Sequence, residues 1–236
     1  MWFFLRKLLN IPFPDTCIVC RKVCDNKGYV CNKCKDVPEY ISSLHRCRTC
    51  LGFIYYSQNG ICGNCLAEKP MYSRFISCVK YRGAIAKSLK AYKFYERPDL
   101  HIGFSKLACK VLEQENISFD TVVPIPLSKK SFKKRGYNQS ALIAKCIAEH
   151  FGAEFCDDAL IKIKETEKQS TLKLRDRKKN IKGAFSVVDK NKLYGRSVLL
   201  VDDIYTTGCT MREAAKMCAP YADDIIAFTI ARGILE

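Results

Sequence analysis

The 236-residue sequence has few of the features that mark a membrane-spanning segment or a secretory signal. No stretch approaches the ~18 consecutive apolar residues that a membrane-spanning helix requires. The opening Met-Trp-Phe-Phe-Leu-Arg-Lys-Leu-Leu has five apolar residues before its first charge, and no basic stretch precedes them. This order and length do not fit a secretory signal. We therefore expect a cytoplasmic protein.

Acidic residues and repeats are also scarce. The chain has 24 Asp and Glu against 40 Lys and Arg, which gives a formal net charge of +16. It contains no low-complexity tract, and its hydrophobic content of 48% is sufficient for an ordinary core and excludes a disordered chain. The length suits one large domain, or one domain with a small added module.

Cysteine, by contrast, is abundant, with 15 residues in the chain and nine of them between Cys17 and Cys65. Two sulfurs separated by a tight turn suit a tetrahedral metal ion better than a disulfide framework or a redox-active pair. Eight thiolates can supply two closed, all-cysteine zinc sites, which are structural because no ligand position is left for water. The predicted ligands form four Cys-x-x-Cys pairs: Cys17 and Cys20, Cys31 and Cys34, Cys47 and Cys50, Cys62 and Cys65.

Two pairings of these cysteines are open. Sequential pairing joins the first pair with the second and the third with the fourth, which makes two small ribbons in a row. A crossed pairing joins the first with the third and the second with the fourth. Cys24 is interpreted as a bystander in either case. Without metal, a stretch this short and hydrophilic is not expected to fold.

From about Tyr72 onward, apolar runs alternate with helical patterns. The spacing predicts strands at 75–81, 121–127, 159–163, 184–188, 198–201 and 225–231, and helices at 83–94, 100–113, 138–151 and 210–218. Strands separated by helices predict an α/β fold with a parallel sheet covered on both faces, and with ligands at the carboxyl ends of its strands. We divide the chain into an apolar and basic segment 1–14, a cysteine-rich module 15–70 and an α/β domain 71–236.

One segment, 198–210, carries most of the functional information. Four apolar residues form a buried strand, Asp202 and Asp203 stand at its carboxyl end, and a Thr-Thr-Gly-Cys-Thr turn leads into a helix. The carboxylates can accept hydrogen bonds from vicinal ribose hydroxyls. The turn's N–H groups and threonine hydroxyls can surround a phosphate at the helix N-terminus, and Gly208 lets the backbone approach closely. The alternative is a strand ending in solvated aspartates, followed by a capped helix.

These residues resemble the 5-phosphoribosyl-1-pyrophosphate (PRPP) motif of type I phosphoribosyltransferases. A wider set is similar to the ComF family of competence-associated proteins, and this similarity leaves out only the first dozen residues and the last few. It implies a phosphoribosyltransferase-like core behind a double zinc ribbon. The resemblance rests on the cysteine pairs, Val123-Pro-Ile-Pro-Leu127, Lys134-Arg-Gly-Tyr-Asn-Gln139, Gln169, Leu172, the run Arg175 to Asn180, and Gly183-Ala-Phe185.

The resemblance also implies roles for individual residues. Asp202 and Asp203 would hold the ribose hydroxyls of PRPP, partly through Mg2+. A flap at 164–182 would close over the reaction centre, with Arg175, Lys178 or Lys179 neutralising the leaving pyrophosphate. The remaining cofactor-binding residues implied are Ile204, Tyr205, Thr206, Thr207, Gly208, Cys209 and Thr210 around the 5-phosphate, and Ser128, Lys129 and Lys130 for pyrophosphate.

The acceptor of such a reaction is not identified by the sequence. Enzymes that salvage 6-oxopurines often carry an aspartate where this chain has Thr206, so the pattern is nearer to orotate-type sites. No histidine stands near the motif, and His45, His101 and His150 are interpreted as structural or surface residues.

A basic stretch suggests a nucleic-acid partner. Residues 128–137 hold five positive charges, no negative charge and two aromatic residues, and residues 121–182 have a net charge of +8. Basic side chains follow a phosphate backbone, and Phe132 and Tyr137 could stack on unpaired bases. The family resemblance implies single-stranded DNA and a DNA-import helicase or other competence machinery as partners. Alternatively, these lysines serve pyrophosphate and form a solvated face.

Three functional hypotheses follow. The first is a PRPP-binding protein of DNA uptake and natural transformation that handles incoming single-stranded DNA on the cytoplasmic side. The second is an active phosphoribosyltransferase of nucleotide metabolism. The third is a PRPP sensor without catalysis.

Overall fold

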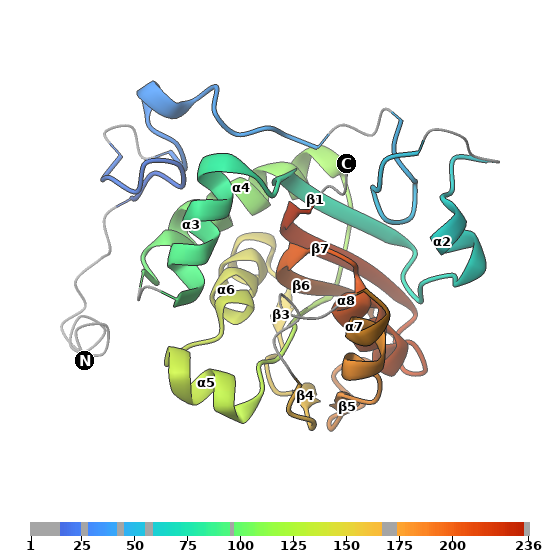
Figure 1. Ribbon diagram of the computed structural model, residues 1–236. Helices are drawn as coiled ribbons and strands as arrows, with labels where there is room; N and C mark the ends of the chain where they lie inside the picture. The colour runs from blue at the N-terminus through green and yellow to red at the C-terminus, as the bar shows by residue number, and fades with distance from the viewer. Residues whose placement is uncertain are drawn as a thin grey trace.

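Five parallel strands form the centre of the molecule. In the computed structural model, which describes residues 15–24, 28–41, 45–54, 59–94, 97–166 and 174–233, their order is β1-β7-β6-β2-β3 (Figure 1). The strands are β1 (Arg74–Lys80), β2 (Thr121–Pro124), β3 (Glu154–Phe155), β6 (Ser197–Tyr205) and β7 (Asp224–Arg232). The predicted α/β fold class with a parallel sheet is confirmed.

The two central strands are apolar on both faces, as expected for parallel strands covered by helices. On one face β6 places Leu199 opposite Ile226 of β7, on the other it places Leu200 opposite Ala227, and all four side chains are buried. β6 continues to Tyr205, whereas the sequence predicted an end at 201. The added residues keep their pairing with β7, so Asp202 and Asp203 lie inside the strand rather than after it.

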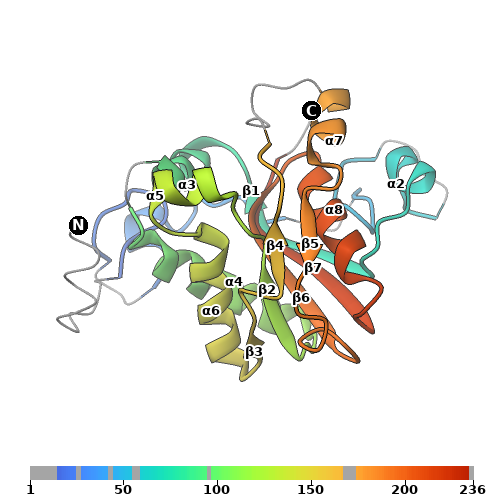
Figure 2. The same cartoon turned by 90° about the horizontal axis from the view of Figure 1, so that it is seen from below.

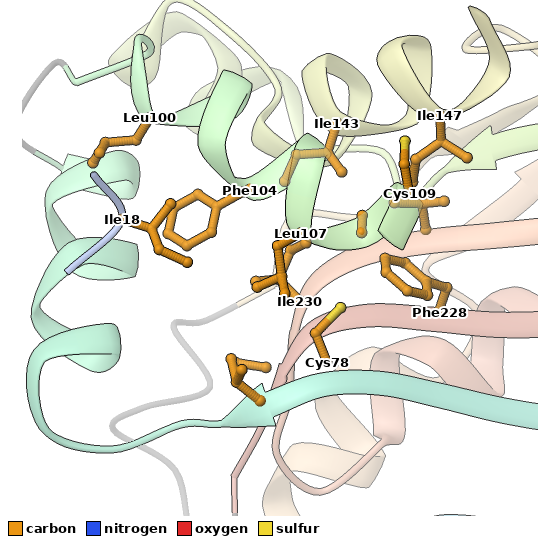
Figure 3. Packing of buried hydrophobic residues seen from close by; sticks show 14 of the residues in the cluster. Ile18, Cys78, Leu100, Phe104, Leu107, Cys109, Ile143, Ile147, Phe228 and Ile230 are labelled. Carbon is orange, nitrogen blue, oxygen red and sulfur yellow. The ribbon is translucent and has the colours of Figure 1, made fainter. Parts of the chain in front are cut away.

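Helices cover both faces of the sheet, as predicted. Seen from below in Figure 2, α3, α4 and α6 lie on one side, and α7 and α8 on the other. Figure 3 shows Phe104 and Leu107 of α4 and Ile143 of α6 packing over Phe228 and Ile230 of β7. The bounds of these helices are α3 Gly83–Phe94, α4 Leu100–Glu115, α6 Gln139–Phe151, α7 Leu174–Ile181 and α8 Cys209–Cys218.

Some elements differ from the prediction. The strands expected at 159–163 and 184–188 form a separate antiparallel pair, β4 (Leu160–Lys162) and β5 (Phe185–Val187), instead of joining the parallel sheet. α5 (Lys129–Arg135), α7 and the short β3 were not predicted. α5 has no apolar periodicity because five of its seven residues are basic. Its start is set by the Ser128 hydroxyl, which accepts a hydrogen bond from the Ser131 N–H at 3.3 Å.

The cysteine-rich part has little regular structure, with only the 3-10 turn η1 (Asn32–Cys34) and the short α2 (Gly63–Ala67) in its described residues. Its first stretch lies against α4, where Ile18 and the Thr16 carbonyl contact the face of Gly103. The predicted segment 1–14 lies outside the described residues, and the domain boundaries stay a prediction. In the described part of the chain, no helix is long and apolar enough to span a bilayer.

Candidate functional site

The two adjacent aspartates of β6 are held by different helices. Asp202 Oδ1 accepts hydrogen bonds from the Ser140 hydroxyl and from the Asp203 N–H, each at 2.9 Å. Asp203 is 3% exposed, and its Oδ1 lies 2.8 Å from Lys93 Nζ at the end of α3. Its other oxygen, Oδ2, is buried and finds no hydrogen-bond partner among the described residues. The pair therefore has one acceptor that nothing in the described chain satisfies.

The electrostatics of the pair favour an added cation. Burial, and after it the charge of Asp203, raise the pKa of Asp202 to about 7, and the Lys93 ammonium opposes this shift. The single positive charge of Lys93 thus faces two desolvated carboxyl groups. Carboxylate oxygens are the ligands that Mg2+ prefers, so the donor set and the unsatisfied Asp203 Oδ2 fit this ion.

A second lysine, Lys162, lies close enough to Asp202 to interact with its charge. Burial lowers the pKa of Lys162 of β4, and this effect is larger than the opposing one from the negative charges of Glu165 and Asp202, which raise it. Its Nζ donates to the Thr166 hydroxyl at 2.7 Å. Lys93, Ser140 and Lys162 were not predicted from the sequence. Ser140 directly follows a family motif, which was a usable signal, whereas the two lysines look like any others in a basic chain.

The loop between β6 and α8 has the shape that the sequence predicted. Gly208 has φ +80°, and a Cβ there would lie 2.1 Å from Tyr205 Oη, so only glycine fits. The cavity beside it measures about 20 Å³, room for about one water molecule, so a ligand would lie over the loop. Seven predicted residues line this cavity, namely Asp202, Ile204, Tyr205, Thr206, Gly208, Cys209 and Thr210, together with Met211 and Thr229.

Two predicted residues of the loop are occupied by contacts within the chain. The Tyr205 side chain is 3% exposed, and its hydroxyl lies 3.1 Å from the Tyr72 hydroxyl. The Thr207 hydroxyl donates to Cys209 Sγ at 3.3 Å. Tyr205 therefore supports the loop from behind, and only its backbone is placed to face a ligand.

The predicted pyrophosphate residues lie at the same edge of the sheet, because β2 and β6 are parallel neighbours. Ser128 is buried as the cap of α5, while Lys129 and Lys130 are exposed. The Lys130 N–H donates to Glu165 Oε1 at 3.1 Å, so a carboxylate already occupies part of this position. Their role toward pyrophosphate stays a prediction.

The predicted flap is described only in part. Gln169 and Leu172 lie outside the described residues, and Arg175 lies in α7 with its side chain outside the described part of the structure. Lys178 pairs with Glu68 Oε2 at 2.6 Å. Lys179 is exposed. Lys178 is therefore tied to the cysteine-rich module in this structure, whereas the sequence suggested a place at the reaction centre.

The eight paired cysteines form two groups of four, and the sequential pairing is the one adopted. Cys17, Cys20, Cys31 and Cys34 make one group, and Cys47, Cys50, Cys62 and Cys65 the other, with the sulfurs of each group within 4.8 Å of one another. The crossed alternative is wrong, and Cys24 belongs to neither group.

Both groups repeat the same local geometry. The Cys31 N–H points to Cys17 Sγ at 3.4 Å, and the Cys62 N–H points to Cys47 Sγ at 3.3 Å. Four converging thiols of this kind are compatible with a structural zinc ion in each group.

The basic stretch forms an exposed surface on α5. Lys129, Lys130, Lys133 and Lys134 are exposed, as is Phe132 with 50% of its surface. The expectation that Tyr137 stacks on bases is wrong, because Tyr137 is 9% exposed and its hydroxyl donates to the Tyr92 carbonyl.

Phe94 supplies the second exposed aromatic side chain instead. It is 52% exposed, and the Arg135 guanidinium lies 5.1 Å from its ring centroid. The basic surface is defined here as Lys129, Lys130, Phe132, Lys133, Lys134, Arg135 and Phe94.

Comparison with known proteins adds relatives along most of the chain. Competence protein F of Haemophilus influenzae is 28% identical over 213 residues, which are 87% of this chain and 91% of that protein. DNA utilization protein YhgH of Escherichia coli is 29% identical over 161 residues, covering 66% and 70% of the two chains. Competence protein ComFC of Bacillus subtilis is 28% identical over 217 residues, covering 86% and 84%. No protein-family profile matches the chain.

Among solved structures, an allosteric regulatory enzyme of purine biosynthesis aligns with a TM-score of 0.40 and 21% identity. The alignment covers 59% of this chain and 29% of that enzyme, so the chain spans less than a third of its length. Adenine phosphoribosyltransferase of Saccharomyces cerevisiae aligns over 59% of this chain and 72% of that one, with a TM-score of 0.38 and 19% identity. The parallel sheet, the two four-cysteine groups and the curated relatives, each 28–29% identical over most of the chain, together support assignment to the ComF family.

Proposed function

We propose that the chain binds PRPP with Mg2+ at the carboxyl edge of its parallel sheet. Asp202 and Asp203 hold the ribose hydroxyls, partly through the ion, and the loop 206–210 holds the 5-phosphate at the start of α8. The observation that carries this proposal is the buried Asp203 Oδ2 without a partner, next to a glycine loop that no larger residue could form.

Bound in this way, PRPP would have its pyrophosphate toward the loop after β2. Ser128, Lys129, Lys130 and, after closure of the flap, Arg175 would then offset the charge of pyrophosphate. In a phosphoribosyl transfer, the bond from the ribose anomeric carbon to the pyrophosphate oxygen breaks, and a bond to the acceptor forms. Mg2+ would supply charge neutralisation to the leaving group. An active enzyme and a PRPP sensor share this binding step and differ only in turnover.

Calorimetry with PRPP and Mg2+ tests the binding step. We expect wild type to bind, and Asp202→Asn/Asp203→Asn to lose affinity by at least about tenfold, because charge-assisted contacts are each worth about 1.5–3 kcal/mol. Asp223→Asn/Asp224→Asn is the matched control, since it removes two adjacent aspartates near the amino end of β7. No binding by folded, zinc-loaded wild type would refute the proposal.

A second part of the proposal concerns DNA. The three curated relatives are named for competence or DNA utilization. We infer that this chain acts in DNA uptake, where it binds incoming single-stranded DNA on the cytoplasmic side together with the import machinery. The basic surface supports this inference, because its exposed lysines share α5 with exposed Phe132, and exposed Phe94 adjoins Arg135 of the same helix. This is the combination that follows a backbone and stacks on bases.

The salt dependence of DNA binding distinguishes contacts at the basic surface from attraction to the net positive charge of the whole chain. For single-stranded DNA, each lost phosphate contact lowers the slope of log K against log salt by about 0.7. Lys133→Glu/Lys134→Glu should therefore lower the slope by about 1.4 or more. Lys190→Glu/Lys216→Glu, which reverses two exposed lysines elsewhere, should change the slope less. Equal effects of the two variants would show that the basic surface is not the binding site.

A further inference from the structure

One buried arginine joins the second cysteine group to the proposed phosphate loop. Arg232, at the end of β7, is 7% exposed. Its Nε donates to the Cys50 carbonyl at 3.0 Å, and its Nη1 donates to the Thr206 carbonyl at 2.8 Å. The guanidinium lies 4.8 Å from the ring centroid of Tyr205. The planar guanidinium of Arg232 therefore fixes the distance between Cys50 of the second cysteine group and Thr206, the first residue of the loop.

A second arginine makes a parallel connection on α8. Arg212, in the first turn of the helix, donates to Cys65 Sγ at 3.0 Å through Nη2 and to the Glu68 carbonyl at 2.7 Å through Nη1. Both ends of the loop are thus tied to the same cysteine group, the start through Arg232 and the helix that follows through Arg212. Tyr72, which follows the cysteine-rich module, adds the contact to the Tyr205 hydroxyl.

The first cysteine group has different neighbours. The Val19 carbonyl accepts a hydrogen bond from the Ser88 hydroxyl of α3 at 3.4 Å. The Arg21 carbonyl accepts one from Arg97 Nη2 at 3.2 Å, next to the start of α4. These contacts connect the first group to the helices on the opposite face of the sheet from α8. The chain therefore contains two similar cysteine groups in different settings, and each serves as a control for the other.

We propose that metal in the second cysteine group sets the shape of the phosphate loop, and that Arg232 is the positioning residue that transmits this constraint. A tetrahedral metal fixes the backbone around its ligands, so the Cys50 carbonyl and Cys65 Sγ stay in place. Arg232 then orients the Thr206 carbonyl, and with it the following N–H groups that would face a phosphate. The inference rests on the proposed function for the identity of the ligand.

Linkage makes this proposal reciprocal. If metal in the second group strengthens phosphate binding by some factor, phosphate must strengthen metal binding there by the same factor. The metal of the first group has no part in this cycle. The expected observation is therefore that the ligand strengthens the binding of one of the two zinc ions and not of the other; this selective effect is called protection below.

Competition for zinc at equilibrium between the full-length, zinc-loaded chain and a chelating dye measures this protection. The probe is ribose 5-phosphate, which carries the 5-phosphate and the hydroxyls but lacks the pyrophosphate that would itself remove zinc. We expect saturating probe to strengthen the binding of one of the two zinc ions by about fivefold or more, the lower range of allosteric coupling, and to leave the affinity for the other unchanged.

Two matched variants assign the effect. Arg232→Met keeps an unbranched aliphatic side chain and removes the hydrogen bonds to the Cys50, Thr206 and Gly233 carbonyls, so the protection by ribose 5-phosphate should disappear. Arg97→Met removes the corresponding arginine contact beside the first group, and the protection should persist. If Arg232→Met does not fold with two zinc ions, Arg212→Lys, whose side chain is partly exposed, should weaken the protection instead.

The outcomes separate this inference from the proposed function. If calorimetry shows that neither PRPP nor ribose 5-phosphate binds, both fail. If ribose 5-phosphate binds but the affinity for both zinc ions stays unchanged, only the coupling is refuted. Protection of both ions, or protection that persists in folded Arg232→Met, also overturns it.

Discussion

Replacing Asp202 with asparagine tests the electrostatics of the carboxylate pair without any ligand. Burial, and then the charge of Asp203, raise the pKa of Asp202 from its usual 3.8 to about 7 in the folded chain. A raised carboxyl pKa means that the folded state holds the proton more tightly than the unfolded state. The stability from this group is therefore fully present below about pH 4 and is lost as the pH rises through about 7.

The size of the effect follows from the two pKa values. Between about pH 6 and about pH 8, this group alone should cost the folded state about 1.3 kcal/mol. Asparagine keeps the shape and an oxygen that can accept the Ser140 hydroxyl, but carries no charge. The free energy of unfolding of Asp202→Asn, relative to wild type, should thus rise by about 1.3 kcal/mol over this range.

Urea unfolding of zinc-loaded protein at the two pH values, without Mg2+ or PRPP, measures this difference. Zinc loss and every other titration are shared by wild type and variant and cancel in the comparison. Asp224→Asn removes the same charge at the amino end of β7 and should show no such trend. A difference between wild type and Asp202→Asn that stays constant from about pH 6 to about pH 8 would refute the reasoning.

Three further predictions concern packing, the loop and the metal. Gly103→Ala places a Cβ 2.6 Å from Ile18 Cγ2 and 2.8 Å from the Thr16 carbonyl oxygen, so we expect a loss of about 1–3 kcal/mol in urea unfolding; an unchanged midpoint would contradict this packing. Gly208→Ala sets a methyl group against the Tyr205 hydroxyl at φ +80°, so PRPP affinity by calorimetry should fall at least about tenfold while zinc content stays the same; wild-type affinity would argue against the phosphate loop. Chelation of both zinc ions should lower the Tm, because η1 and α2 are the only helical elements in the described part of residues 15–70; an unchanged thermal transition would contradict a structural role for zinc.

The part of the site that the sequence revealed is the part built from near neighbours. Two cysteines three positions apart can share a metal wherever they occur, and an apolar strand followed by a glycine turn and a helix makes its own phosphate loop. These features need only local geometry, so the two four-cysteine groups and the glycine turn after β6 could be predicted from the sequence, while the binding role of residues 202–210 stays a prediction. The helices at Gly83–Phe94 and Gln139–Phe151 were equally visible, since their apolar residues recur at helical spacing.

Contacts between distant residues were decided by the tertiary structure alone. Lys93 of helix α3 reaches Asp203 of strand β6, and Tyr137 is buried against Tyr92 where the sequence suggested stacking on bases. The central strand runs four residues past its apolar core because β7 continues beside it. Arg232 meets Cys50 across 182 positions of chain. Neither periodicity nor spacing in the sequence predicts such a contact, because it depends on how the sheet and helices pack. The sequence by itself determined which residues could bind a metal or a phosphate, and packing decided which of their neighbours hold them in place.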